Sequence, residues 1–223
     1  KNTGWTKCYN DYEPGTAFQY CNLNYNMIGA VIERISGERF DQYVKYHVLD
    51  PLGLYGGYCV DSLDKSRFAS IYEYNRDSAK FFASPDAYAP RSEIIANYTM
   101  GYSTPVFSPT GGMKISAPDL AQFMIMHMKE GKHRGKRIMS KKSAREMQSL
   151  LTDNEKERYG LAISTTDKLI AGKTLKGHTG VAYGLFSAMF FQPEEKFGIV
   201  VISNGCHPGY TEGFNTVIRK TVN

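Results

Sequence analysis

The sequence predicts an α+β protein, in which an antiparallel sheet flanked by helices is joined to a helical lobe. Apolar residues recur at helical spacing in several segments of the first two thirds of the chain. The last third instead contains four strand-length runs that are rich in β-branched and aromatic residues. We therefore expect a mainly helical lobe with a long irregular segment over residues 1–155 and an antiparallel sheet with a C-terminal helix over residues 156–223, in one integrated fold.

Two helices are predicted near the N-terminus. The first spans Asn24–Ser36 and is followed by Gly37, a residue type that commonly stops a helix. The second spans about residues 40–48 and should end at Asp50–Pro51, because the residue before a proline avoids the helical region. Residues 51–110 show no sustained period, so we expect a long irregular segment with short helical turns. The apolar residues at helical spacing in the first helix are Met27, Ile28, Val31, Ile32 and Ile35.

Two more helices are predicted before the sheet. Ser116 can cap a helix whose first turn contains Pro118 and Asp119 and which should end at Gly131. The next helix spans Ser140–Leu151. The side chains expected to face inward are Leu120, Phe123, Met124 and His127 or Met128 in the former, and Ala144, Met147 and Leu151 in the latter.

The predicted strands follow one another with short connections, as in an antiparallel meander. Residues 193–196, Pro-Glu-Glu-Lys, form a hairpin connection between the last two strands. Thr211 is expected to cap a closing helix. The strands are Tyr159–Thr165, Lys173–His178, Leu185–Gln192 and Phe197–Ser203, and one face of the closing helix comprises Phe214, Val217, Ile218 and Val222.

Charge and hydropathy argue against a nucleic-acid partner and against a transmembrane segment. The 223-residue chain has a net charge of +5, part of which lies in the basic run 129–137. Such a run can attract nucleic acid or an acidic cell-wall polymer, but no aromatic residue is interleaved there to stack on bases. We interpret it as a solvated loop and expect no nucleic-acid partner. No run approaches the roughly 18 apolar residues that span a bilayer, so no transmembrane segment is expected.

Four cysteines fit neither a zinc pattern nor a Cys-x-x-Cys redox motif. If the protein is exported, one or two disulfides can form, and the sequence does not distinguish the three full pairings. Buried free thiols are the alternative interpretation. The residues are Cys8, Cys21, Cys59 and Cys206.

Two short stretches hold the residues that could perform chemistry. Residues 18–22 read Phe-Gln-Tyr-Cys-Asn and precede the first helix, whereas residues 176–180 read Lys-Gly-His-Thr-Gly and lie near the start of the sheet. Taken singly, Tyr20 is explained by packing and His178 by a structural hydrogen bond. Their shared context favours a different interpretation, in which both side chains converge on one pocket.

That context is a series of motifs in a fixed order. The motifs closely resemble those of the serine β-lactamase and penicillin-binding-protein superfamily, in particular its class C β-lactamase-like branch. The resemblance covers roughly residues 10–55 and 105–222 and implies a partial β-lactamase/transpeptidase-like fold. The motifs are EPGTAFQYCN at 13–22, YNMIGAVIERISG at 25–37, PLGL at 51–54, TGG at 110–112, SAPDLA at 116–121, HTG at 178–180 and GIVVISN at 198–204.

The resemblance implies roles for six residues. Tyr20 and Asn22 match the family's Tyr-x-Asn element, whose tyrosine relays the nucleophile's proton and whose asparagine holds the substrate amide. This chemistry requires a tyrosine pKa well below about 10, or a tyrosine that passes a proton without resting as phenolate. A neighbouring lysine would supply the positive field that lowers such a pKa. The segment His178-Thr179-Gly180 matches the family's Lys-Thr-Gly element, which attracts a substrate carboxylate, and the backbone N–H of Val181 is a candidate oxyanion donor.

The sequence departs from the family pattern in two ways. His178 replaces a lysine, so attraction of a carboxylate becomes weaker and pH-dependent. The family's nucleophile, in a Ser-x-x-Lys segment ahead of Tyr-x-Asn, has no match among the residues before Tyr20. The literal match Ser62-Leu63-Asp64-Lys65 comes after Tyr20 in an irregular segment, and we interpret it as a chance occurrence.

We therefore expect the C-terminal portion of an exported, periplasmic or secreted serine hydrolase. Its parent would act by acyl transfer on an amide or ester next to a carboxylate, such as a β-lactam, a D-Ala peptide or an ester. The resemblance implies no metal or cofactor. The isolated chain should be inactive, and its uncovered surfaces should favour self-association or a missing N-terminal fragment. Two alternatives remain: a non-catalytic module that binds cell-wall peptides after losing its nucleophile, and a fragment without any ligand.

Overall fold

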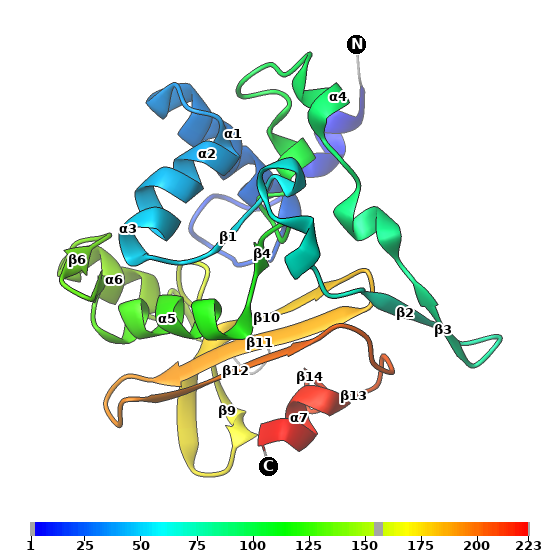
Figure 1. Cartoon of the computed structure of the whole chain (residues 1–223). Helices are drawn as coiled ribbons and strands as arrows, with labels where there is room; N and C mark the ends of the chain where they lie inside the picture. Colours follow the sequence, from blue (N-terminus) through cyan, green and yellow to red (C-terminus); the bar gives the residue numbers. More distant parts are fainter. Residues whose placement is uncertain (1–2, 154–157, 223) are drawn as a thin grey trace.

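The computed structural model describes residues 3–153 and 158–222, so the expected boundary between residues 155 and 156 lies outside the described residues. Its centre is a six-stranded antiparallel sheet with the order β12-β11-β10-β9-β8-β7. Helix α5 packs on one face of this sheet and α7 on the other (Figure 1). These strands are β7 (Thr152–Asp153), β8 (Arg158–Tyr159), β9 (Ser164–Ile170), β10 (Lys173–Ala182), β11 (Leu185–Gln192) and β12 (Phe197–Ser203).

The remaining elements lie mostly in the helical lobe, and the predicted α+β class is confirmed. The α-helices are α1 (Asn22–Ser36), α2 (Phe40–Val44), α3 (Asp50–Leu52), α4 (Ser92–Ile95), α5 (Ala117–Met128), α6 (Lys141–Gln148) and α7 (Thr216–Val222). The 3₁₀ turns are η1 (Thr3–Cys8), η3 (Val60–Ser62), η4 (Lys65–Arg67), η5 (Pro85–Tyr88) and η6 (Thr104–Phe107), and η2 (Lys45–Leu49) is a π turn. The two-stranded pairs are β1 (Gly56–Gly57) with β4 (Lys114–Ile115), β2 (Tyr72–Asn75) with β3 (Lys80–Ala83), β5 (Lys132–His133) with β6 (Lys136–Arg137), and β13 (Tyr210–Thr211) with β14 (Phe214–Asn215).

Strands β11 and β12 have the predicted bounds and the predicted hairpin connection. Alternation along β11 points Phe186, Ala188 and Phe190 toward α7, where each is at most 4% exposed. Burying a phenylalanine such as Phe190 contributes roughly 2–3 kcal/mol, so this layer is a main source of stability. Phe191 points to the opposite face, toward His127 of α5.

The predicted strand Tyr159–Thr165 is wrong, because the chain turns in its middle. Tyr159 ends β8, the backbone N–H of Gly160 donates to the carbonyl of Ile163 at 2.8 Å, and β9 begins at Ser164. Ala162 has a φ of 60°, a left-handed conformation that belongs to a tight turn. The apolar and β-branched content of this run is therefore divided between two strands.

The closing helix begins later than predicted. Thr211 and Phe214 belong to the β13–β14 hairpin rather than to a helix cap and its first turn. Glu212 and Gly213 between them have positive φ values of 52° and 86°, which an α-helix does not tolerate. The actual start is stabilised by Asn215, whose side-chain oxygen accepts from the backbone N–H of Val217 at 2.9 Å.

The predicted helix end at Asp50–Pro51 is also wrong. Asp50 keeps helical φ and ψ of −60° and −44°, and α3 continues to Leu52. The π turn directly before Pro51 shifts the hydrogen-bond register at a point where proline has no N–H to donate. Gly53, in the left-handed conformation with a φ of 68°, ends the helical stretch.

The segment 51–110 is not wholly irregular, because it contains the β2–β3 hairpin with Tyr72 paired to Ala83. The basic run forms the small β5–β6 hairpin, rather than only a loop. Ser116 caps α5 as predicted, since its side chain accepts from the N–H of Asp119. Leu151 was expected to face inward but is 63% exposed, because α6 ends at Gln148.

Helix α1 buries the side opposite to its apolar stripe. Gly29 and Glu33 are its buried residues, and Glu33 is 1% exposed. Gly37 ends the helix as predicted, with a φ of 71° and its N–H bonded to the carbonyl of Glu33. Ile32, at the margin of the stripe, packs against the buried cluster of Phe40, Cys59 and Phe107. The other members of the stripe are exposed, with fractions of 51% at Met27, 54% at Ile28, 53% at Val31 and 82% at Ile35.

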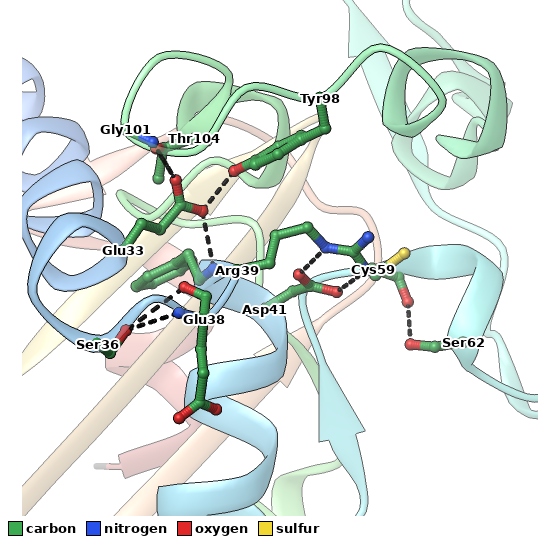
Figure 2. A network of polar contacts seen from close by, with 11 residues as sticks. Glu33, Ser36, Glu38, Arg39, Asp41, Cys59, Ser62, Tyr98, Gly101 and Thr104 are labelled. Carbon is green, nitrogen blue, oxygen red and sulfur yellow. Dashed lines mark hydrogen bonds and ion pairs between the residues drawn. The ribbon is translucent and has the colours of Figure 1, made fainter.

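Four donors surround the buried Glu33 carboxylate, as Figure 2 shows for three of them with their residues labelled. The backbone N–H of Phe40 donates at 2.8 Å and that of Gly101 at 2.7 Å, while the hydroxyls of Thr104 and Tyr98 donate at 2.6 and 2.5 Å. Burial alone would raise the pKa of Glu33, but these donors outweigh it and lower the pKa. Glu33 is therefore a carboxylate in the folded chain, and its hydrogen bonds connect α1 to the start of α2 and to the segment 98–104.

Candidate functional site

A pocket of about 400 Å³ lies where the start of the lobe meets the sheet. Its walls come from Phe18 and Tyr20, from β8 and β9, from β10 and from the turn at 212–214. Three of the predicted site residues line it: Tyr20, His178 and Thr179. Parts of the chain that are far apart in sequence therefore form one cavity at the edge of the sheet.

The predicted convergence of Tyr20 and His178 is present in the structure. Their ring centroids are 5.9 Å apart and the rings are tilted by 34°. Tyr20 is held in extended chain just before α1, whereas His178 projects from the middle of β10. Tyr20 is 42% exposed, so its ring is open to a ligand entering the pocket.

The local chain fixes the tautomer of His178. Its Nδ1 lies 2.5 Å from the backbone carbonyl oxygen of Thr179. A carbonyl oxygen only accepts, so Nδ1 carries the hydrogen and the neutral ring has its lone pair on Nε2. In the neutral ring, Nε2 is therefore the acceptor nitrogen of His178.

Tyr20 does not have the lowered pKa that a proton relay through a resting phenolate would require. Burial raises its pKa above the ordinary value, and the neighbouring Tyr25 raises it further. Tyr20 therefore keeps its proton in this chain and presents a hydroxyl rather than a phenolate. Of the two options derived from the sequence, only passing a proton without resting as phenolate fits this environment.

Tyr159 is a member of the site that the sequence did not reveal. Its ring centroid lies 5.1 Å from that of Phe18, 6.1 Å from Tyr20 and 5.9 Å from His178, and its hydroxyl is 3.2 Å from that of Tyr25. Tyr159 stands in a two-residue strand, for which hydrophobic period gives no signal.

The other predicted site residues lie beside the pocket and do not line it. Asn22 is the exposed first residue of α1. Gly180 and Val181 follow on β10, and the side chain of Val181 is 58% exposed. Within the described residues, β9 pairs with β10 no further than the Gly177 and Ser164 pair, so the later part of β10 has one open edge. Backbone N–H groups on that edge are available as oxyanion donors.

The chance match Ser62 to Lys65 does not line this pocket. The hydroxyl of Ser62 donates to the carbonyl of Cys59 at 2.9 Å (Figure 2). Ser62 lines a different, smaller cavity together with Arg39. Ser164 is the serine that the described part of the chain contributes to the candidate pocket, and its hydroxyl donates to the carbonyl of Gly177 at 2.7 Å. Since a carbonyl is not a general base, neither serine is activated as a nucleophile.

All four cysteines are free thiols in the structure, with Cys59 and Cys206 buried. Burial raises the pKa of Cys206, which makes its thiol less reactive. Among residues 3–153 and 158–222, no three His, Cys, Asp or Glu side chains come together as metal ligands would. Over the same described stretches, no helix has the length and apolar character to cross a bilayer.

Comparison with known proteins gives the site its context. The sequence model of the family described as Beta-lactamase matches residues 7–222. Protein flp of Staphylococcus aureus strain MW2 is 22% identical over 203 residues, which are 86% of this chain and 34% of that protein. The chain thus spans about a third of the length of the curated relatives that it matches.

Two solved structures have a similar fold. The octameric penicillin-binding protein homologue from Pyrococcus abyssi is 25% identical with a TM-score of 0.69, over 89% of this chain and 41% of that one. The D-amino acid amidase from Ochrobactrum anthropi SV3 is 18% identical with a TM-score of 0.67, over 95% of this chain and 56% of that one.

Proposed function

This chain belongs to the beta-lactamase family of serine hydrolases, and we propose that it is the C-terminal part of an enzyme that transfers acyl groups from an amide or ester beside a carboxylate. The observation that carries the proposal is the 5.9 Å separation of the Tyr20 and His178 rings in one pocket that Thr179 also lines. Substrates of this chemistry are a β-lactam, a D-Ala peptide or an ester. The name of the similar D-amino acid amidase fits the amide option.

Each residue has a physical role in this proposal. The hydroxyl of Tyr20 passes the nucleophile's proton, and its raised pKa favours a transfer in which no phenolate accumulates. His178 and Thr179 attract the substrate carboxylate, and Asn22 holds the substrate amide. The backbone N–H of Val181, which follows Gly180 of the His-Thr-Gly element, stabilises the oxyanion from the open edge of β10.

The nucleophile is assigned to a Ser-x-x-Lys segment outside the residues of this chain. Three observations support this assignment. The pocket's own Ser164 is bonded to a carbonyl, the chain spans 34–56% of the similar proteins named above, and α1 leaves an apolar stripe uncovered. The lysine of that segment would also supply the positive field that Tyr20 lacks here. As part of an exported enzyme, the protein would be periplasmic or secreted and would take a small-molecule or peptide substrate.

Acylation tests both parts of the proposal. The 223-residue chain is incubated with a fluorophosphonate or a penicillin, and intact mass should show no covalent adduct. A form extended upstream to include the Ser-x-x-Lys segment should be acylated stoichiometrically, and Tyr20→Phe should slow that reaction by about 10²–10⁴-fold. Rapid labelling of the short chain would contradict the assignment of the nucleophile. An extended form that carries the serine and still resists both reagents would contradict the enzymatic function.

A binding module is the second candidate, because His178 and Thr179, the proposed carboxylate-binding pair, line a pocket without an activated serine in the described residues. Such a module would bind a D-alanyl dipeptide without cleaving it. The upstream coding sequence separates the two candidates: an encoded Ser-x-x-Lys favours the enzyme, and a native start at Lys1 favours the binding module.

A further inference from the structure

Tyr159 is a buried ring in contact with the candidate site. It is 8% exposed, whereas its neighbour Tyr20 is 42% exposed. Its contacts come from three separate parts of the chain: the segment before α1, α1 itself through Tyr25, and β10 through His178. Among the described residues, it belongs to none of the three buried apolar clusters. Its packing is therefore directed at the site rather than at the core.

The geometry of these contacts restricts the ring in two ways. Tyr159 meets Tyr20 at 78° and His178 at 85°, both edge-on, which is a favoured arrangement for aromatic pairs. Its hydroxyl, 3.2 Å from that of Tyr25, anchors the far end of the ring to α1. Such edge-on pairs are favourable beyond the burial of the rings, so they select one arrangement of two partly exposed rings.

Tyr20 and His178 have few other restraints of this kind. Tyr20 stands in extended chain, and its other described ring contact is with Tyr25 at 5.8 Å. The hydrogen bond at Nδ1 of His178 is made within its own strand. It therefore does not determine the position of the lobe that carries Tyr20 relative to the sheet. A single side chain that touches both rings can determine it.

We infer that Tyr159 is a positioning residue, which fixes the distance and tilt between the Tyr20 ring on the lobe and the His178 ring on the sheet. The inference rests on the proposed function for the roles of Tyr20 and His178, but the geometric effect is independent of catalysis. Misplacement of a catalytic group by about 1 Å can cost on the order of 10²-fold in rate, so a residue of this kind affects turnover without touching substrate.

Nuclear magnetic resonance of the 223-residue chain tests the inference. The ring signals of His178 are identified by their loss in His178→Gln. Cross-relaxation between the ring protons of Tyr20 and His178, whose ring centroids are 5.9 Å apart, reports the separation of the two rings. Tyr159→Leu should weaken or abolish this cross-relaxation. Tyr159→Phe keeps the ring and removes only the hydroxyl, so it should retain most of it. Tyr9→Leu, at a tyrosine that is 75% exposed, is the matched control and should change nothing.

A merely structural role gives a different result. In that case Tyr159→Leu lowers the free energy of unfolding while the cross-relaxation between the rings of Tyr20 and His178 in the folded protein stays unchanged, and the inference is overturned. If Tyr159→Leu does not fold, cross-relaxation between the ring protons of Tyr159 and His178 in the unsubstituted chain decides, and its absence overturns the inference. Neither measurement needs acylation, so a failure of the proposed function is recognised separately. In an extended form that is acylated, Tyr159→Leu should slow acylation and Tyr159→Phe should restore most of the rate.

Discussion

The carboxylate of Glu33 accepts a 2.6 Å hydrogen bond from the hydroxyl of Thr104, and both residues are almost completely buried. This contact defines the inner side of α1, which an inspection of hydropathy would place on the opposite side of the helix. A charged residue faces the interior because remote donors satisfy it, and the apolar stripe faces outward.

Glu33→Gln should destabilise the chain by about 3 kcal/mol, because an amide presents donors to groups that already donate and leaves buried donors unpaired. Denaturant unfolding at neutral pH measures the change. Glu38→Gln is the matched control, since Glu38 is 38% exposed and pairs with His47 at the surface. Its effect should stay within about 1 kcal/mol. Equal effects of the two substitutions would contradict the role assigned to the buried network.

The same carboxylate predicts a loss of stability in acid. The pKa of Glu33 is lowered in the folded chain, so its contribution is present above the ordinary glutamate pKa and is lost as pH falls through the lower folded value. Glu33→Gln should therefore reduce the dependence of the free energy of unfolding on pH below about 4.5, the region in which an unfolded glutamate titrates.

The donors of Glu33 also show where sequence analysis fails. Helical spacing predicted α1 and its end at Gly37, because both depend on local residues. The four groups that bind Glu33 come from segments between residues 40 and 104, and no local pattern predicts their arrival. Long strands such as β11 and β12 were predicted with their bounds, whereas β2, β3 and β8 are too short for a period of two to be recognised.

Gly177→Ala should separate the strand that carries His178 from its neighbour. An added Cβ would lie 1.9 Å from the carbonyl oxygen of Met189 and 2.7 Å from the Cα of Phe190, and both are backbone atoms that cannot rotate away. We expect a loss of about 1–3 kcal/mol in the free energy of unfolding. Gly111→Ala is the control, since a Cβ there meets nothing within 4 Å. A neutral Gly177→Ala would show that β10 and β11 are further apart than the structure has them.

In the candidate site, too, the sequence predicted one contact and did not reveal another. The Tyr-x-Asn and His-Thr-Gly motifs predicted that Tyr20 and His178 meet, because motif order carries information about a whole fold. Tyr159 belongs to no such motif, and its hydroxyl contact with Tyr25 joins residues far apart in the chain. Three-dimensional packing alone brings Tyr159 into the site.

His127 should destabilise the folded chain between pH 6.5 and 4. Burial in α5 lowers its pKa from 6.5 to about 4, and its Nδ1 has no hydrogen-bond partner among the described residues. The unfolded chain binds the proton first as pH falls, so stability decreases across this window by about 3 kcal/mol. His127→Gln should flatten the curve of unfolding free energy against pH. His207→Gln, at an exposed histidine, should leave it as steep. Parallel curves for the unsubstituted chain and His127→Gln would contradict the prediction.

The uncovered stripe of α1 should govern self-association of the isolated chain. Ile28 and Val31 are about half exposed, so the double substitution Ile28→Lys and Val31→Lys should change the free energy of unfolding by no more than about 0.5 kcal/mol. Apolar side chains at this spacing on a helix form a patch that favours contact with another apolar surface. Light scattering at increasing concentration should therefore show association of the unsubstituted chain and less of it after the double substitution. Ile94→Lys, at a 47% exposed isoleucine of α4, is the control and should leave association unchanged. A chain that stays monomeric at all concentrations, or one that associates equally after the double substitution, would show that the stripe is not a contact surface.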